Sequence, residues 1–129
     1  MSRRGGKYGN SKTQVDGIEF DSRKEASYYL YLKELLNDGT ISNLRLQVAY
    51  ELLPPIWREE VQQLKTKEKI VRKCIQRATH YVADFVYTDN KTGNEEVVDV
   101  KSRITRKKDA YILKKKMMLA LKGIEIMEV

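Results

Sequence analysis

Two short stretches near the middle of the chain place a carboxylate among apolar, mostly β-branched residues. They are residues 81–85, with the sequence YVADF, and residues 98–101, with the sequence VDVK. Apolar runs of this length are typical of buried strands. Residues 89–94 between them are rich in turn formers, and Gly93 can adopt a positive φ. The pattern therefore predicts a β-hairpin.

This hairpin would bring two acidic residues together. If its turn is centred near Lys91 and Thr92, Asp84 faces Asp99 with Cβ atoms about 4.5–5.5 Å apart. The two-residue period of a strand then puts Lys101 on the same face as Asp99. A slip of one residue in the turn would undo this pairing. Two buried carboxylates repel unless they are neutralised, and a shared divalent cation is the simplest explanation for them. The alternative is a surface hairpin with solvated carboxylates.

The rest of the pattern predicts an α/β (α+β) domain with a mixed central sheet flanked by helices, in the order α-β-β-β-α-β. Residues 15–20 indicate a tight turn or short hairpin, and a helix is expected from Asp21-Ser22 to about Asn37. Residues 44–53 alternate as a strand, which Pro54-Pro55 ends. A second helix is expected over about 105–122, before Gly123, and a last strand over 124–129.

Two details of this prediction concern the least regular segments. Residues 54–77 are highly charged and poorly periodic. We expect a surface excursion there, with one short helix bearing Trp57, Val61 and Leu64, after which residues 70–77 extend the following strand. The apolar stripe of the second helix is expected to comprise Ala110, Leu113, Met117 and Leu121.

Two polar residues have more than one interpretation. Ser22 and Glu25 match the S-x-x-E capping box, which explains a glutamate there without any chemistry. The other interpretation directs the Glu25 carboxylate toward the Asp84 and Asp99 pair. Gln47 either points toward that pair, where it could hold a water or a phosphate, or is an ordinary polar residue of its strand. The local pattern favours the cap for Glu25 and the ordinary role for Gln47.

The chain is basic, with 25 Lys and Arg residues against 18 Asp and Glu and a net charge of +7. Such a charge indicates a polyanionic partner, either nucleic acid or an anionic membrane surface. Basic residues gather in segment 1–14, which we interpret as a flexible arm, and in segment 101–116, directly after the acidic pair. The second segment is either a solvated helix face or a phosphate-binding surface, and its position favours the latter. The candidate DNA-contacting residues are Arg3, Arg4, Lys7, Arg103, Arg106, Lys107, Lys108, Lys114 and Lys115.

Length and composition narrow the class of protein. A chain of 129 residues forms one domain, here 15–129 after the arm. Cys74 is the only cysteine and His80 the only histidine, which excludes an internal disulfide and a Cys/His zinc site. Neither a secretion signal nor a run of membrane-spanning length is evident, so we expect a cytoplasmic protein without membrane association.

The ordered set of a helix glutamate (Glu25), a strand aspartate (Asp84) and then Asp99-Val100-Lys101 resembles the PD-(D/E)XK nuclease superfamily. More closely, KYGNSKTQVDGIEFDSRKEASYYLYL, YVADFVY and VVDVKS resemble a family of small phage and prophage nucleases that are similar to Holliday-junction resolvases. The resemblance runs from about Lys7 to the end, apart from 54–77. The first motif reads Ala83-Asp84 instead of Pro-Asp. A restriction-endonuclease-like core is the fold that this resemblance implies.

The activity that the resemblance implies is Mg²⁺- or Mn²⁺-dependent hydrolysis of DNA phosphodiester bonds. Asp84, Asp99, Glu25 and the Val100 carbonyl would bind the metal, and Lys101 would orient the attacking water or stabilise the charge at phosphorus. We expect a homodimeric endonuclease that selects branched DNA. It would act in phage recombination or replication, in the cytoplasm of a bacterial host. No small-molecule cofactor is expected.

Two other functions are compatible with the sequence. The first is a DNA-binding recombination accessory without hydrolytic activity, and the second is a phage assembly protein that uses its basic arm on packaged DNA. Heat stabilisation by a divalent metal that Asp99→Asn abolishes would favour the nuclease. The assembly protein predicts no binding of divalent metal.

Overall fold

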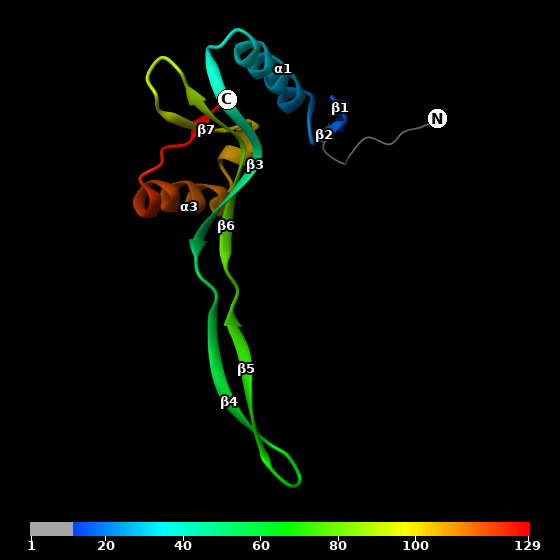
Figure 1. Ribbon diagram of the computed structural model, residues 1–129, viewed down its shortest axis with the longest axis vertical. Helices are drawn as coiled ribbons and strands as arrows, with labels where there is room; N and C mark the ends of the chain where they lie inside the picture. The colour runs from blue at the N-terminus through cyan, green and yellow to red at the C-terminus, as the bar shows by residue number, and fades with distance from the viewer. Residues whose placement is uncertain (1–11) are drawn as a thin grey trace, which may run out of the picture.

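The computed structural model describes residues 12–129, and the chain folds as a mixed α+β protein (Figure 1). Its elements, in chain order, are β1 (Thr13–Val15), β2 (Ile18–Phe20), α1 (Arg23–Asn37), β3 (Ile41–Leu53), β4 (Ile56–Gln63), β5 (Glu68–Gln76), β6 (Thr79–Asp89), β7 (Glu95–Asp99), α2 (Arg103–Arg106), α3 (Asp109–Met117), the π-helical turn η1 (Met118–Lys122) and β8 (Met127–Glu128). Without the β1–β2 and β4–β5 hairpins, the order is the expected α-β-β-β-α-β.

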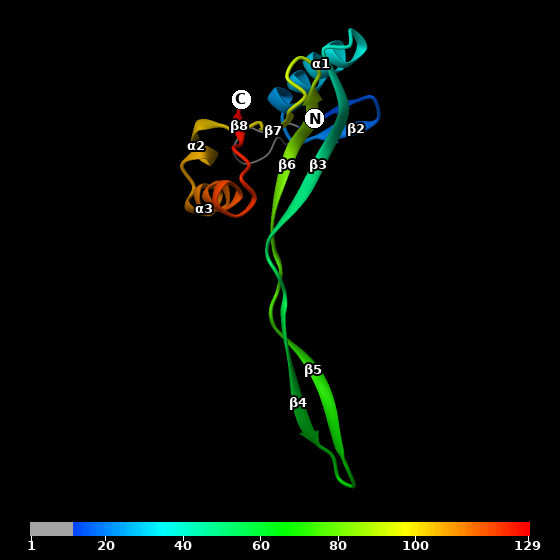
Figure 2. The ribbon, with the colours of Figure 1, turned by 60° about the vertical axis from the view of Figure 1, so that its left-hand side comes forward.

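A four-stranded mixed sheet forms the centre of the molecule, with the strand order β3-β6-β7-β8. The first two pairings are antiparallel, and β7 pairs with β8 in parallel. Helix α1 and the helical segment from α2 to η1 lie on opposite sides of β7 and β8 (Figure 2). This confirms a mixed sheet flanked by helices.

The β6–β7 hairpin has the register that the turn residues predict. Phe85 pairs with Val98 and Val86 with Val97. The paired residues end at Phe85 and Val98, directly before Asp84 on the one strand and Asp99 on the other. The turn is closed by Asp89 and Asn94, and Gly93 has a φ of 78°, which a residue with a side chain would adopt only under strain. The turn chemistry thus fixes which residues of the two strands are neighbours.

Two clusters of buried side chains hold the helices to the sheet. One cluster joins α1 to the sheet through Phe20, Tyr29, Leu32, Phe85 and Val98. The other joins the C-terminal helical segment to the sheet through Tyr81, Val86, Val97, Tyr111 and Met118. Because each cluster is anchored on the β6–β7 hairpin, that hairpin is the rigid platform from which the two acidic side chains project.

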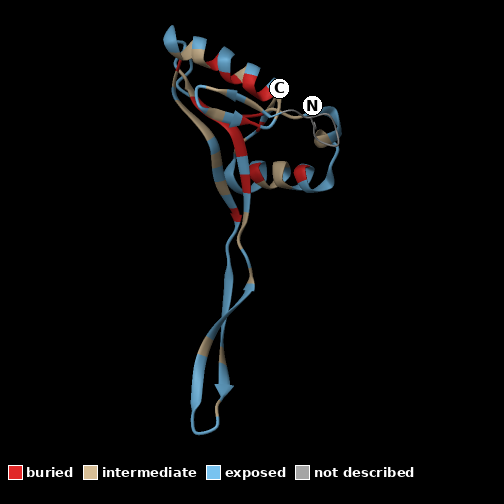
Figure 3. Cartoon of the chain, turned by 90° about the vertical axis from the view of Figure 1, so that its right-hand side faces the viewer, coloured by how far each residue is buried: buried red, intermediate tan, exposed pale blue. Residues whose placement is uncertain are grey.

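The β4 and β5 strands form a long two-stranded arm that projects from the body (Figures 1 and 3). Residues 54–77 are therefore the expected surface excursion, but the short helix expected around Trp57 and Val61 is wrong. Trp57 pairs with Cys74 and Val61 with Ile70 across the arm. Apolar residues four apart suit a helix, yet they also share one face of a strand, and pairing with residues 68–76 decides between the two.

The second helix is broken where one continuous helix over 105–122 was expected. Helix α2 ends at Arg106, α3 begins at Asp109, and the last turn is π-helical before Gly123, whose φ is 69°. The expected stripe is also wrong in part, since Leu113 is 58% and Leu121 56% exposed. Tyr111 and Met118 are buried instead. The face with the larger aromatic and thioether side chains fills the space beside the sheet.

The N-terminal expectations are met in part. The short hairpin over 15–20 is present as β1 and β2, with Asp16 and Gly17 in its turn. Residues 13 and 14, which we assigned to the basic arm, belong to β1. Arg3, Arg4 and Lys7 lie outside the described residues. Within residues 12–129, no helix has the length and apolar character needed to cross a lipid bilayer.

Candidate functional site

Helix α1 presents Glu25 to the sheet from its first turn. Ser22 is the N-cap, and its hydroxyl oxygen accepts a hydrogen bond of 3.1 Å from the Glu25 backbone N–H. The Glu25 carboxylate, however, accepts a bond of 3.2 Å from the side-chain amide of Gln47 on β3. The cap therefore sets where the helix begins, while the Glu25 side chain is directed toward the sheet.

The β6–β7 hairpin supplies the two aspartates, and each has a different set of partners. Asp84 Oδ2 accepts a bond of 2.8 Å from the backbone N–H of Val100. Asp99 Oδ2 accepts a bond of 2.6 Å from the Tyr81 hydroxyl, and its Oδ1 lies 3.2 Å from Lys101 Nζ. That ammonium contact lacks hydrogen-bond geometry, so Oδ1 is a buried oxygen without a hydrogen-bond partner. Asp99 therefore retains an acceptor oxygen for a further ligand.

Gln47 joins α1 to the hairpin. Its amide nitrogen lies 3.2 Å from Glu25 Oε2 and 3.3 Å from Asp84 Oδ1. The residue has a φ of 53°, the left-handed region that costs a non-glycine residue about 1–3 kcal/mol. On β3 and β6, Leu46 pairs with Phe85 and Val48 with Ala83. Gln47 therefore lies opposite Asp84. The interpretation that Gln47 points toward the acidic residues is confirmed.

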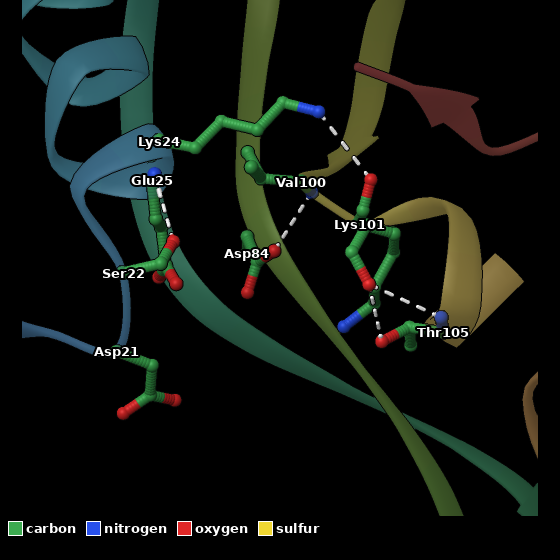
Figure 4. A pocket seen from close by; sticks show the side chains of 9 residues that line it. Asp21, Ser22, Lys24, Glu25, Asp84, Val100, Lys101 and Thr105 are labelled. Carbon is green, nitrogen blue, oxygen red and sulfur yellow. Dashed lines mark hydrogen bonds between the residues drawn. The ribbon is translucent and has the colours of Figure 1, made fainter. Parts of the chain in front are cut away.

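These residues surround a pocket of about 290 Å³ between the N-terminus of α1 and the end of the hairpin (Figure 4). Glu25 lines it from α1, Asp84 from β6, and Val100 and Lys101 from the segment after β7. Asp99 is not part of this lining and borders a second pocket, which shares Lys101 with the first. Four of the five predicted site positions thus meet in one pocket, and the fifth is in contact with them through Lys101.

Burial sets the electrostatics of the acidic residues. Glu25 is 7%, Asp84 8% and Asp99 0% exposed. Burial, with help from Asp84, raises the pKa of Glu25 to about 7. Burial also raises the pKa of Asp99, and Asp84 adds to the rise, while the Tyr81 hydroxyl and the Lys101 ammonium oppose it. A site that raises the pKa of its carboxyl groups in this way favours a nearby cation, because the cation removes the repulsion between them.

The donor atoms suit a hard divalent cation. Carboxylate and carbonyl oxygens are the ligands that Mg²⁺ and Mn²⁺ prefer, and Asp99 Oδ1 is a buried acceptor in need of a partner. In the described part of the chain, no three acidic, histidine or cysteine side chains converge as a ready set of ligands. The Gln47 amide links Glu25 and Asp84, and the side chains would have to turn toward a shared ion.

Two further residues complete the surroundings. Lys24 lines the pocket, and its ammonium donates a bond of 3.4 Å to the Lys101 carbonyl (Figure 4). Tyr81, on the neighbouring strand β6, fixes Asp99 through the hydrogen bond from its hydroxyl. Sequence reasoning missed both. Strand alternation gives no signal for Tyr81, because a residue three positions before Asp84 is expected on the opposite face of the sheet. Lys24 is one of several helix lysines, and nothing in its spacing marks it.

The predicted DNA-contacting residues fall into separate groups. Lys108 and Lys114 line the second pocket beside Lys101. Lys115 pairs with Glu128 at 3.2 Å, and it lines a third pocket with Arg106 on the far side of α3. Arg103 and Lys107 are exposed to solvent. The cluster that looks uniform in the sequence therefore divides into residues that face the acidic site and residues that do not.

Fold and site together define a mixed α+β protein in which a lysine stands beside three buried carboxyl groups. The chain belongs to the family described as protein of unknown function DUF1064, which matches residues 5–126. No curated protein and no solved structure matches the chain. A function must therefore be inferred from the site itself.

Proposed function

We propose that the protein is a divalent-metal-dependent endodeoxyribonuclease with a restriction-endonuclease-like core. The observation that carries this proposal is the meeting of Glu25, Asp84 and Lys101 in one pocket, with Asp99 held against Lys101. Buried carboxyl groups with raised pKa values and a lysine among them are costly to maintain in a fold. Such arrangements are concentrated at functional sites.

The groups that would hold the metal are Glu25, Asp84 and Asp99, with the Val100 carbonyl. When bound, Mg²⁺ or Mn²⁺ lowers the pKa of a coordinated water and neutralises negative charge on phosphoryl oxygens. The Val100 N–H fixes one oxygen of Asp84, and the Tyr81 hydroxyl fixes one oxygen of Asp99. Both side chains are therefore restrained before any ligand arrives. Asp99 Oδ1 has no hydrogen-bond partner, whereas Asp84 Oδ1 accepts a bond from Gln47 that a cation would have to displace.

Lys101 is the residue that we expect to act on the reacting groups. Its ammonium is half-buried, lies 3.2 Å from Asp99 Oδ1 and borders both pockets. There it orients the attacking water and stabilises the negative charge that develops on the phosphate. The water oxygen bonds to phosphorus and gives up a proton to solvent, while the bond to the leaving sugar oxygen breaks and that sugar oxygen takes up a proton. Removal of such a group typically lowers the rate by about 10²–10³-fold.

Selection of branched DNA and a homodimeric assembly remain part of the proposal. The basic residues beside the site contact a phosphate backbone without reading base sequence. The arm carries exposed apolar residues, among them Val61 and Ile70, which are 63% and 69% exposed. An isolated two-stranded hairpin is marginally stable in water, so contact with DNA or a second subunit would support the arm.

The test is a cleavage assay with Mg²⁺ or Mn²⁺ on linear duplex, single-stranded, flap and four-way-junction DNA. Wild type is compared with Asp84→Ala and Lys101→Ala. The matched controls are Asp109→Ala and Lys91→Ala, which change the same charges at exposed positions away from the pocket. We expect cutting by wild type and both controls, with loss in the two site variants and a preference for the branched substrates.

Other results would revise the proposal. Equal cutting of all substrates would retain the nuclease and remove the selection of branched DNA. Binding of DNA without cutting under every condition, unchanged in Asp84→Ala and Lys101→Ala, would overturn the nuclease and leave a non-catalytic DNA-binding protein. The bridge from Gln47 to Glu25 and Asp84 would then be a purely structural network.

A further inference from the structure

A second pocket, of about 340 Å³, lies beside the acidic one. One wall is the stretch 80–82 of β6, and the other is the start of α3, with Lys108, Tyr111 and Lys114. Lys101 and Thr105 line both pockets. A chain-like ligand that occupies the acidic pocket can therefore continue into the second without leaving the surface between them.

The two pockets differ in charge. The acidic pocket contains Glu25 and Asp84, whereas the second is lined by the ammonium-bearing side chains of Lys101, Lys108 and Lys114. Its one carboxylate is Asp99, which is fully buried and already bonded to Tyr81. No ion pair among residues 12–129 involves Lys108 or Lys114. Their charges are therefore available to an anion from outside the chain.

Lys115, next to Lys114 in the sequence, is not available to an anion in the way that Lys108 and Lys114 are. Lys115 lies one residue further along α3, yet its ammonium is 3.2 Å from Glu128 Oε1. Glu128 also accepts a bond of 2.6 Å from the Tyr111 hydroxyl. Lys115 thus serves the packing of α3 on β8, while Lys114 is turned toward the second pocket.

Apolar surface completes the second pocket. Tyr81 and Tyr111 are 3% and 9% exposed, and their hydroxyls are bonded to Asp99 and Glu128, so they form the buried floor of the pocket. Val82 and Ala110 add aliphatic surface. Ammonium groups beside exposed aliphatic surface suit a nucleotide, because its phosphate pairs with the cations and its sugar contacts the apolar wall.

We propose that the second pocket binds the nucleotide next to the scissile bond, with Lys108 and Lys114 on its phosphate. This inference rests on the proposed nuclease function. It states that the substrate is a polynucleotide bound across two adjoining subsites, not an isolated phosphate ester. Lys101 lies at the boundary of the two pockets, where it contacts the scissile phosphate and the neighbouring phosphate of the same strand.

The test measures DNA binding separately from cleavage. Anisotropy of a labelled duplex is recorded in EDTA over a range of salt for wild type and the double variant Lys108→Gln/Lys114→Gln. Glutamine keeps the first part of the aliphatic stem and removes the charge, so packing is disturbed less than by alanine. The matched control is Lys116→Gln/Lys122→Gln, which removes the same charge from exposed positions that do not line the second pocket.

We expect Lys108→Gln/Lys114→Gln to weaken binding at least tenfold and to reduce the slope of log K against log salt by about 1.8, since each lost phosphate contact removes about 0.9. The control should change the slope by less than half of that. Equal losses in both double variants would overturn the subsite, even if wild type cleaves DNA. Failure of wild type to cleave any substrate would instead overturn the proposed function, and with it the placement beside a scissile bond.

Discussion

The Tyr81 hydroxyl donates a hydrogen bond of 2.6 Å to Asp99 Oδ2, in the interior of the protein. Burial raises the pKa of Tyr81 well above its usual range, so the phenol remains a donor at every physiological pH. The bond fixes one oxygen of a carboxyl group that has no access to solvent. It leaves the other oxygen beside Lys101, where the proposed chemistry takes place.

Tyr81→Phe tests this relationship. The substitution leaves a buried carboxylate oxygen without its donor, which costs about 1–3 kcal/mol. We therefore expect the free energy of unfolding, measured by urea denaturation, to fall by that amount. Tyr31→Phe is the control, because Tyr31 is 51% exposed. Equal stability of Tyr81→Phe and wild type would show that the bond contributes nothing to the fold.

A divalent cation should stabilise the protein through the acidic residues. We expect the Tm of wild type to rise in Mg²⁺ or Mn²⁺, since a ligand that binds only the folded state stabilises it. Asp99→Asn should abolish the rise, measured against the Tm of the same variant in EDTA, because one proposed ligand is lost. Asp109→Asn should respond as wild type does. A metal-dependent rise that persists in Asp99→Asn would contradict the ligand role of Asp99.

Gln47→Ala should change metal binding and stability in opposite directions. The Gln47 amide nitrogen lies between two carboxylates that a cation would otherwise share. Its removal leaves Glu25 and Asp84 to repel each other, so the Tm in EDTA should fall. The rise in Tm on adding Mg²⁺ should be larger than for wild type, because no amide has to be displaced. Gln62→Ala, on the exposed arm, is the control.

The stability of the metal-free protein should decrease with pH. The pKa of Glu25 is raised from 4.5 to about 7, so the folded state holds a proton that the unfolded state releases. The stabilising contribution is present in full below about pH 4.5 and is lost as the pH rises through 7. Asp99, whose pKa is also raised, acts in the same direction.

The measurement for this pH effect is the urea midpoint in EDTA between pH 5 and pH 8. Glu25→Gln cannot ionise and should show a shallower decrease than wild type, with higher stability at pH 8. Glu19→Gln, at an exposed position of β2, should follow wild type. The expectation fails if Glu25→Gln retains the wild-type slope.

The arm should be dispensable for folding of the body. Leu53 and Thr79 are paired where β3 and β6 leave the sheet, so an Asn-Gly turn can replace residues 54–78. None of the buried residues in the two core clusters lies in the arm. We expect a cooperative thermal transition with a Tm within a few degrees of wild type. Loss of the transition would show that the arm packs on the body or on a second subunit during folding.

Some features followed from the sequence because local interactions decide them. Ser22 caps α1 at the expected position, and the turn around Gly93 sets the register that pairs Phe85 with Val98, next to Asp84 and Asp99. Each of these depends on residues that are close in the chain. The apolar runs around Asp84 and Asp99 also indicated, correctly, that both carboxyl groups are buried.

Other features were decided by tertiary contacts. The 56–63 stretch carries no clear period, and its pairing with 68–76 made it a strand of the arm. The Glu25 side chain points toward the sheet because β3 brings Gln47 beside it. Lys114 lines a pocket with β6 residues, whereas Lys115 pairs with Glu128 of β8, so their different roles depend on which strand each one meets. Sequence alone determined helix α1, the turn around Gly93 and the burial of Asp84 and Asp99. The partner of each polar side chain depended on residues distant in the chain, because a buried polar group binds whatever the fold places within its reach.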